Sequence, residues 1–126
     1  MDKKKRILVV EDDMLTAYWL TSELTNMGYY TYESVTTGEC AVEFAVLNKP
    51  DFILMDIWLS GKLNGIEAAE KILSSCNTYI IFMSGYPEST FLEMNKKINF
   101  EAYLTKPLQI YDLENTLQRV NNLKNC

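Results

Sequence analysis

The feature that most constrains the fold is an apolar run ending in an acid, Phe52-Ile53-Leu54-Met55-Asp56, with Pro50 just before it. A short continuous apolar run bounded by turn residues is typical of a strand buried on both faces. Such strands belong to parallel sheets covered by helices, in which ligand sites form beyond the carboxyl ends of the strands. Asp56 is therefore predicted to lie at that edge, where an ionised carboxylate needs a neutralising partner.

Four more segments have the apolar or β-branched composition of strands. Between consecutive strands, apolar residues recur at the spacing of a helix. The predicted strands span residues 6–10, 29–33, 52–56, 78–83 and 100–105. The predicted helices span 14–27, 36–48, 88–97 and 108–123, with a further one beginning at Gly65. Gly28 is expected to end the first helix, and Thr36 with Glu39 resembles a capping box that opens the second.

The spacing of apolar residues also predicts which side of each helix faces the core. The expected inward residues are Ala17, Leu20, Leu24 and Met27; Cys40, Ala41, Phe44, Ala45 and Leu47; Ile66, Ala69, Ile72 and Leu73; Phe91, Leu92 and Met94; and Ile110, Leu113, Leu117 and Val120.

Alternation of strands and helices predicts an α/β fold, with a doubly wound parallel sheet built by right-handed crossovers. The run at residues 29–33 is more polar than the others, so we expect it at an edge. The flavodoxin-like (βα)5 strand order 2-1-3-4-5 follows, which makes the first and third strands neighbours.

Polar residues stand at the ends of the apolar runs. In the predicted order Glu11 and Asp12 meet Asp56, and three close carboxylates repel one another unless a cation joins them. Hard oxygen ligands suit Mg²⁺, which can bridge a carboxylate and a phosphoryl oxygen. Asp56 could then act as a carboxylate nucleophile that accepts a phosphoryl group. Ser84 offers a hydroxyl and Lys106 an ammonium group for the phosphoryl oxygens.

Composition narrows the class of function. The 126 residues suffice for one domain, and the net charge of −5 argues against a nucleic-acid-binding surface. Lys3-Lys4-Lys5-Arg6 is interpreted as a solvated lead-in, and no segment has the length of a signal peptide core or a membrane span. The three widely spaced cysteines are expected to stay reduced in a cytoplasmic protein. The chain has no histidine, so any phosphohistidine chemistry needs a second molecule.

At these residues the sequence resembles the receiver domain of two-component response regulators, the CheY-like superfamily. The match keeps the order and spacing of Ile7-Leu8-Val9-Val10-Glu11-Asp12, Asp56, Ser84 and Lys106-Pro107, and spans nearly the whole chain. The resemblance implies that Asp56 is the phosphoacceptor. It also implies a Mg²⁺ site made by Asp12, Asp56, the main-chain carbonyl of Trp58 and, through water, Glu11.

Further roles follow from the same resemblance. Ser84 and Lys106 would contact the phosphoryl group, Ser84 and Tyr103 would form the switch, and the Lys106-Pro107 peptide would be cis. The chain would be a single receiver domain, residues 1–126 with a core of about 6–122. It would not be an enzyme beyond its own phosphorylation and dephosphorylation. A histidine kinase or phosphotransfer protein would supply the phosphoryl group. An effector would bind the face of the fourth helix, fifth strand and fifth helix, and phosphorylation could drive a homodimer.

Some positions depart from the family pattern. Ser60 replaces a frequent proline, Trp58 is bulkier than usual, and the loop to Gly65 looks one residue longer than usual. The alternatives are a pseudo-receiver that is never phosphorylated, a haloacid-dehalogenase-like phosphohydrolase and a flavodoxin. The phosphohydrolase needs a second Asp where Trp58 stands, and acids at the first strand–helix loop would repel the phosphate of a flavin.

Overall fold

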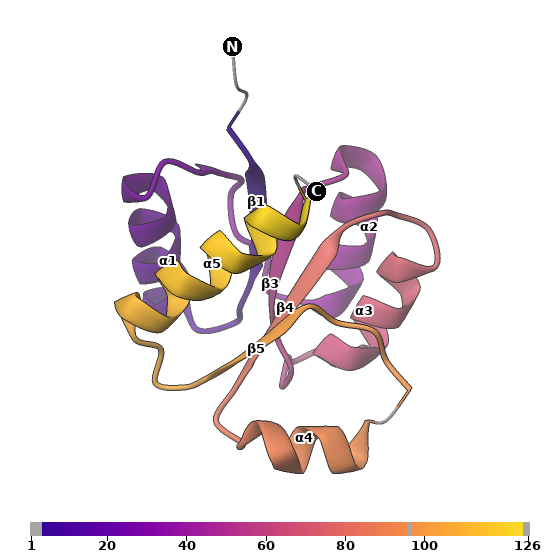
Figure 1. The fold of residues 1–126 in the computed structure, drawn as a ribbon. Helices are drawn as coiled ribbons and strands as arrows, with labels where there is room; N and C mark the ends of the chain where they lie inside the picture. Colours follow the sequence, from indigo (N-terminus) through magenta and orange to yellow (C-terminus); the bar gives the residue numbers. More distant parts are fainter. Residues whose placement is uncertain (1–3, 96, 125–126) are drawn as a thin grey trace.

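A computed structural model gives the structure of this chain and describes residues 4–95 and 97–124. The elements alternate strictly along the chain (Figure 1): β1 (Arg6–Val10), α1 (Met14–Asn26), β2 (Tyr30–Thr31), α2 (Gly38–Asn48), β3 (Phe52–Asp56), α3 (Gly65–Leu73), β4 (Tyr79–Ser84), α4 (Glu88–Met94), β5 (Ala102–Thr105) and α5 (Ile110–Lys124). The strands form one parallel sheet in the order β2-β1-β3-β4-β5. The flavodoxin-like (βα)5 fold and its strand order, both predicted from the sequence, are confirmed.

Helices cover both faces of the sheet and enclose two apolar layers. One layer joins Ile7, Val9 and Leu54 to α1 and α5. The other joins Leu8, Val10 and neighbouring strand residues to α2, α3 and α4. Alternate residues of each strand point to opposite layers, so a strand buried on both sides must be apolar throughout. This explains the unbroken run in β3, all five residues of which are buried.

The edge strand β2 is shorter than predicted. Only Tyr30 and Thr31 pair with β1, and a separate bridge joins Val10 to Val35 farther along. The polar character of residues 29–33 therefore indicated the edge position correctly but overstated the strand length. β5 is also shorter than expected, since it begins at Ala102 and not at Phe100.

Several local predictions about the helices are wrong. The helix α2 is capped by Thr37, whose side chain accepts a hydrogen bond from the Cys40 amide, so the capping box of Thr36 with Glu39 is absent. Five side chains expected to face the core are exposed: Cys40, Leu47, Leu92, Met94 and Ile110.

Other helix ends also differ from the predictions. The helix α4 stops at Met94, which is itself exposed, and α5 begins at Ile110 and not at Leu108. Gly28 follows α1 with φ +97°, the left-handed conformation expected of a residue that ends a helix. Among residues 4–95 and 97–124, no helix combines the length and apolar character needed to cross a bilayer. Lys3 and Cys126 lie outside the described residues.

Candidate functional site

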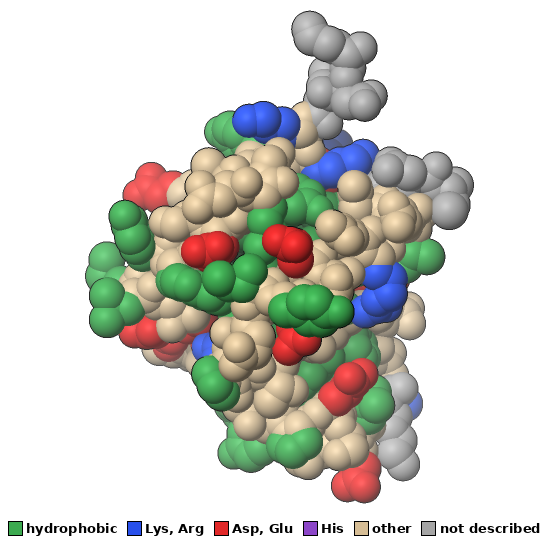
Figure 2. Space-filling model, turned by 60° about the vertical axis from the view of Figure 1, so that its left-hand side comes forward, with side chains coloured by type: hydrophobic (Ala, Val, Ile, Leu, Met, Phe, Trp, Pro, Cys, Tyr) green, Lys and Arg blue, Asp and Glu red, His purple; other side chains and the backbone are tan. Residues whose placement is uncertain are grey.

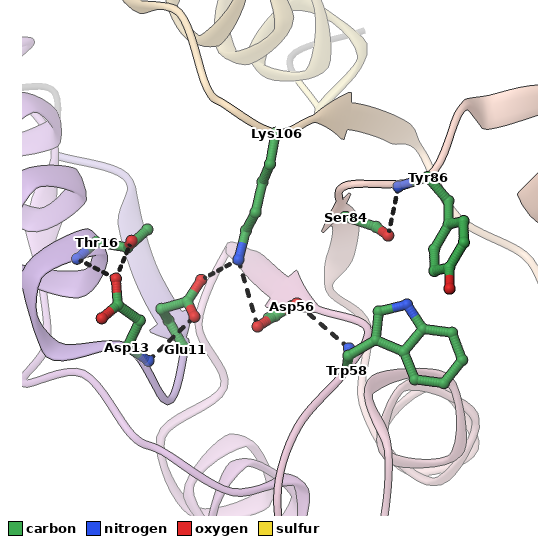
Figure 3. Close-up of polar contacts among 8 residues, drawn as sticks. All are labelled: Glu11, Asp13, Thr16, Asp56, Trp58, Ser84, Tyr86 and Lys106. Carbon is green, nitrogen blue, oxygen red and sulfur yellow. Dashed lines mark hydrogen bonds and ion pairs between the residues drawn. The ribbon is translucent and has the colours of Figure 1, made fainter.

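The candidate site lies at the carboxyl edge of the sheet, where four strand ends bring their polar residues together (Figure 3). Asp56 is the last residue of β3 and Ser84 the last of β4, while Glu11 and Lys106 directly follow β1 and β5. Glu11, Asp56 and Ser84 are almost fully buried, with exposures of 1%, 5% and 1%. Buried polar side chains at the end of apolar strands are costly, so they need partners within the site.

Lys106 is the cation that links the two buried acids. Its Nζ lies 2.7 Å from Glu11 Oε2 and 3.4 Å from Asp56 Oδ2. Figure 3 shows the lysine reaching between the two carboxylates from above. The other Glu11 oxygen accepts a hydrogen bond from the Asp13 amide at 3.1 Å, and Asp56 Oδ1 accepts one from the Trp58 amide at 3.3 Å. Both acids are therefore held in place by the loop residues that follow them.

Burial perturbs the acid–base properties of this cluster. Burial, and then the charge of Glu11, raises the pKa of Asp56 from 3.8 to about 7, although Lys106 opposes the change. For Lys106, burial acts to lower the pKa. The hydrogen bond to Glu11 and the charges of both acids outweigh that effect, so the pKa of Lys106 is raised. The two shifts have the same direction, since the pKa of Asp56 and the pKa of Lys106 are both raised.

The third acid, Asp12, is exposed and completes a set of oxygens suited to a cation. Each of the three acids, Glu11, Asp12 and Asp56, has one carboxylate oxygen within 4.8 Å of an oxygen of the other two. The donors are hard oxygens, which fit Mg²⁺. The pKa of Asp56 is raised first by burial and then by the charge of Glu11. A divalent cation here would favour the ionised form of Asp56. Asp13 does not join the cluster, since its side chain caps α1 through the amide and hydroxyl of Thr16.

Ser84 and Tyr103 are connected through Tyr86. The Ser84 hydroxyl accepts a hydrogen bond from the Tyr86 amide at 3.1 Å, and the Tyr103 hydroxyl donates to the Tyr86 carbonyl at 2.6 Å. The Tyr103 ring also packs against Phe91, with ring centroids 5.0 Å apart. Ser84, Tyr86, Phe91 and Tyr103 line part of a pocket of about 140 Å³.

An aromatic pair that was not predicted from the sequence lies beside the site. Trp58 and Tyr86 make an edge contact with ring centroids 5.8 Å apart, and each ring is about half exposed. Trp58 is two residues after Asp56 and Tyr86 two residues after Ser84, and in each case the amide of the aromatic residue bonds to that side chain. The shared spacing of two residues between a polar site residue and an aromatic one is the pattern in the sequence from which this pair could have been predicted. The Lys106-Pro107 peptide is cis, as expected.

A five-stranded parallel fold with this acid and lysine cluster defines a class of α/β proteins whose site suits a cation and a phosphoryl group. Comparison with known families makes the assignment specific. The model of the response regulator receiver domain matches residues 7–118, and the chain belongs to that family.

Individual relatives agree with the assignment. The chain is 33% identical over 109 residues to the transcriptional regulatory protein PdtaR of Mycobacterium tuberculosis, covering 86% of this chain and 53% of PdtaR. It therefore spans about half the length of that relative. It is 32% identical to the protein PilH of Pseudomonas aeruginosa, covering 92% of this chain and 94% of PilH.

A solved structure similar to this chain contains a metal ion. The receiver domain of a sensor histidine kinase from Pseudomonas aeruginosa, described with a magnesium ion coordinated in the active site cleft, is 29% identical. The two structures superpose with a TM-score of 0.82 over 93% of this chain and 97% of that one.

Proposed function

We propose that this protein is a phosphorylated receiver, in which Asp56 accepts a phosphoryl group from a phosphohistidine on a partner kinase or phosphotransfer protein. One observation carries the proposal. Asp56 lies at one edge of the sheet together with two other acids, and Lys106 and Ser84 lie at the same edge. No single one of these residues would indicate phosphoryl transfer. None of the 126 residues is a histidine, so the phosphohistidine donor lies outside this sequence.

The transfer conserves atoms and charge in a simple way. An oxygen of the Asp56 carboxylate forms a bond to phosphorus, the bond from phosphorus to the histidine nitrogen breaks, and the nitrogen keeps the electron pair. Asp56 must be ionised to attack, and a pKa of about 7 leaves it partly protonated at neutral pH. The acids Glu11 and Asp12, with Asp56 and the main-chain carbonyl of Trp58, would hold Mg²⁺, which when bound neutralises charge on the carboxylates and the phosphoryl oxygens.

Lys106 and Ser84 would bind the new phosphoryl group. Lys106 already lies 3.4 Å from Asp56 Oδ2, so its ammonium group is placed to pair with a phosphoryl oxygen. The Ser84 oxygen accepts the Tyr86 amide, which leaves its own hydroxyl proton free to be donated. Movement of Ser84 toward the phosphoryl group would break that amide contact and change the support of Tyr103 through Tyr86. We propose this as the switch.

The partners fit different surfaces. Around the site, α1 presents three large exposed apolar side chains, Met14, Leu15 and Tyr18, with exposures of 74–80%. Figure 2 shows a face on which apolar and acidic side chains are interspersed, a surface suited to a protein partner. We propose that the phosphodonor contacts this side. The effector would bind the face of α4, β5 and α5, and that face is also available for a homodimer after phosphorylation.

The test is the intact mass of the protein after incubation with a small acyl-phosphate donor and Mg²⁺. We expect one phosphoryl adduct, absent from Asp56→Asn and absent when Mg²⁺ is chelated. Self-phosphorylation and self-dephosphorylation are the only chemistry that we propose for this chain. A protein that forms no adduct and consumes no donor would instead be a pseudo-receiver, an interaction module that works without phosphorylation.

A further inference from the structure

The loop between β3 and α3, residues 57–64, is fastened at its tip to the start of α2. The Leu63 amide donates a hydrogen bond of 2.8 Å to Glu39 Oε1, a contact between residues 24 apart in the sequence. Gly61 has φ +102°, and a Cβ on it would lie 2.9 Å from Glu39 Oε2. A Cβ on Gly38 would lie 2.8 Å from the Leu63 carbonyl oxygen. Gly38 therefore allows a close approach to the loop backbone that a larger residue would prevent, and the positive φ of Gly61 favours glycine at that position.

The contact is charge-assisted. The hydrogen bond from the Leu63 amide, and to a lesser degree that from Lys62, lowers the pKa of Glu39. The carboxylate is ionised at neutral pH, and hydrogen bonds from backbone amides to ionised acceptors are stronger than those between neutral groups. Glu39 was expected to cap its own helix. The structure instead directs its side chain to a different loop.

The same loop carries the main chain that adjoins Asp56. At its base, the Gly65 amide donates to the Ile57 carbonyl at 2.8 Å. Directly after Ile57, the Trp58 amide donates to Asp56 Oδ1 at 3.3 Å. The loop is thus closed at its base by a backbone hydrogen bond and held at its tip by Glu39. Trp58 lies on the segment between these two attachments.

We propose that Glu39 is a positioning residue of the divalent-cation site. By holding the loop tip, its carboxylate sets the fraction of molecules in which the main chain at Trp58 has the conformation that the cation requires. This inference rests on the proposed function, because the role of the Trp58 carbonyl belongs to that proposal. The inference assigns a role to Glu39 of α2, although no atom of Glu39 belongs to the cluster of Glu11, Asp12 and Asp56.

Removal of the carboxylate should weaken cation binding without destroying it. When only a fraction of molecules has the competent loop conformation, the apparent dissociation constant rises in inverse proportion to that fraction. We expect Glu39→Ala to raise the apparent Kd for Mg²⁺ about fivefold. The rate of phosphorylation by a small acyl-phosphate donor should return to that of the unmodified protein once Mg²⁺ is saturating, because Asp56 and Lys106 are unchanged.

The experiment is a Mg²⁺ titration at constant ionic strength, monitored by Trp58 fluorescence in a Trp19→Phe background. The variants are Glu39→Ala and Glu39→Gln, whose amide oxygen can still accept the Leu63 amide proton. Gly61→Ala perturbs the same contact from the loop side. The matched control is Glu43→Ala, which removes the same charge from an exposed position one turn farther along α2. Hydrogen exchange of the loop amides without Mg²⁺ adds a measurement independent of the metal.

The expected pattern is weaker binding in Glu39→Ala and Gly61→Ala, affinity largely restored in Glu39→Gln, and no change in Glu43→Ala. Faster exchange of the Leu63 amide in Glu39→Ala should accompany it. Equal Mg²⁺ affinity in the unmodified protein and in folded Glu39→Ala and Gly61→Ala would overturn the inference while leaving the proposed function intact. Equal weakening in Glu43→Ala would also overturn it, since net charge would then be the cause. Absence of Mg²⁺ binding in the unmodified protein would refute the proposed function and the inference together.

Discussion

The raised pKa of Asp56 predicts that the acid at the centre of the site destabilises the metal-free fold. Below pH 3.8 the carboxyl group is protonated in both the folded and the unfolded chain. As the pH rises to about 7, the unfolded chain loses this proton while the folded chain retains it. Stability falls with pH wherever the folded state binds more protons, so the penalty grows through this interval and is complete above it.

The size of the penalty follows from the two pKa values. Each pKa unit corresponds to about 1.4 kcal/mol, so a rise from 3.8 to about 7 amounts to about 4 kcal/mol. Asp56→Asn replaces the acid with a neutral group of the same shape. The variant should therefore gain up to about 4 kcal/mol over the unmodified protein at pH 8, and little of this gain should remain at pH 4.

Urea denaturation in the presence of a chelator, at intervals from pH 4 to pH 8, measures this difference. The other titrating groups are common to both proteins, so most of their contribution cancels in the comparison. Mg²⁺ at pH 8 should stabilise the unmodified protein and have a smaller effect on Asp56→Asn. A stability difference that stays constant across the pH range would refute the reasoning, because it would show that Asp56 has an ordinary pKa.

Three other substitutions test the site and its surroundings. Lys106→Met leaves Glu11, which is 1% exposed, without its cation, and should cost about 3 kcal/mol of metal-free stability, measured by urea denaturation. Gly65→Ala should cost about 3 kcal/mol, since a Cβ there would overlap the backbone at the end of β3, whereas Gly85→Ala has open space and serves as the control. If Asp56 is phosphorylated as proposed, Trp58→Ala should admit water to the phosphoryl group. The lifetime of the adduct, followed by intact mass over time, should then shorten several-fold.

Each of these expectations has a clear contrary result. Unchanged stability of Lys106→Met would mean that the ion pair of Lys106 with Glu11 contributes nothing to the metal-free fold. Equal losses in the two glycine variants would remove the steric argument, since only one position is crowded. An adduct that decays at the same rate after truncation of the tryptophan would show that the aromatic pair does not limit water access.

The sequence by itself determined the strands of the sheet interior and the chemistry at their ends. The apolar runs before Glu11, Asp56 and Ser84 are local patterns, and burial on both faces of a parallel sheet requires them. Where such a run stops at a polar residue, that residue lies at the sheet edge. The strand order then brings the residues together, which is why the cluster could be predicted without coordinates.

Tertiary structure decided the partners of these residues and the details of the helices. The pairing of Lys106 with Glu11 joins residues 95 apart, and that of Glu39 with Leu63 joins residues 24 apart. No local pattern encodes either contact, and Glu39 had a plausible helix cap as its local explanation. Leu47 and Ile110 likewise belong to apolar helix patterns but are exposed in the folded molecule. Periodicity predicts that a helix has an apolar side, but the packing of the whole molecule determines how much of that side is covered.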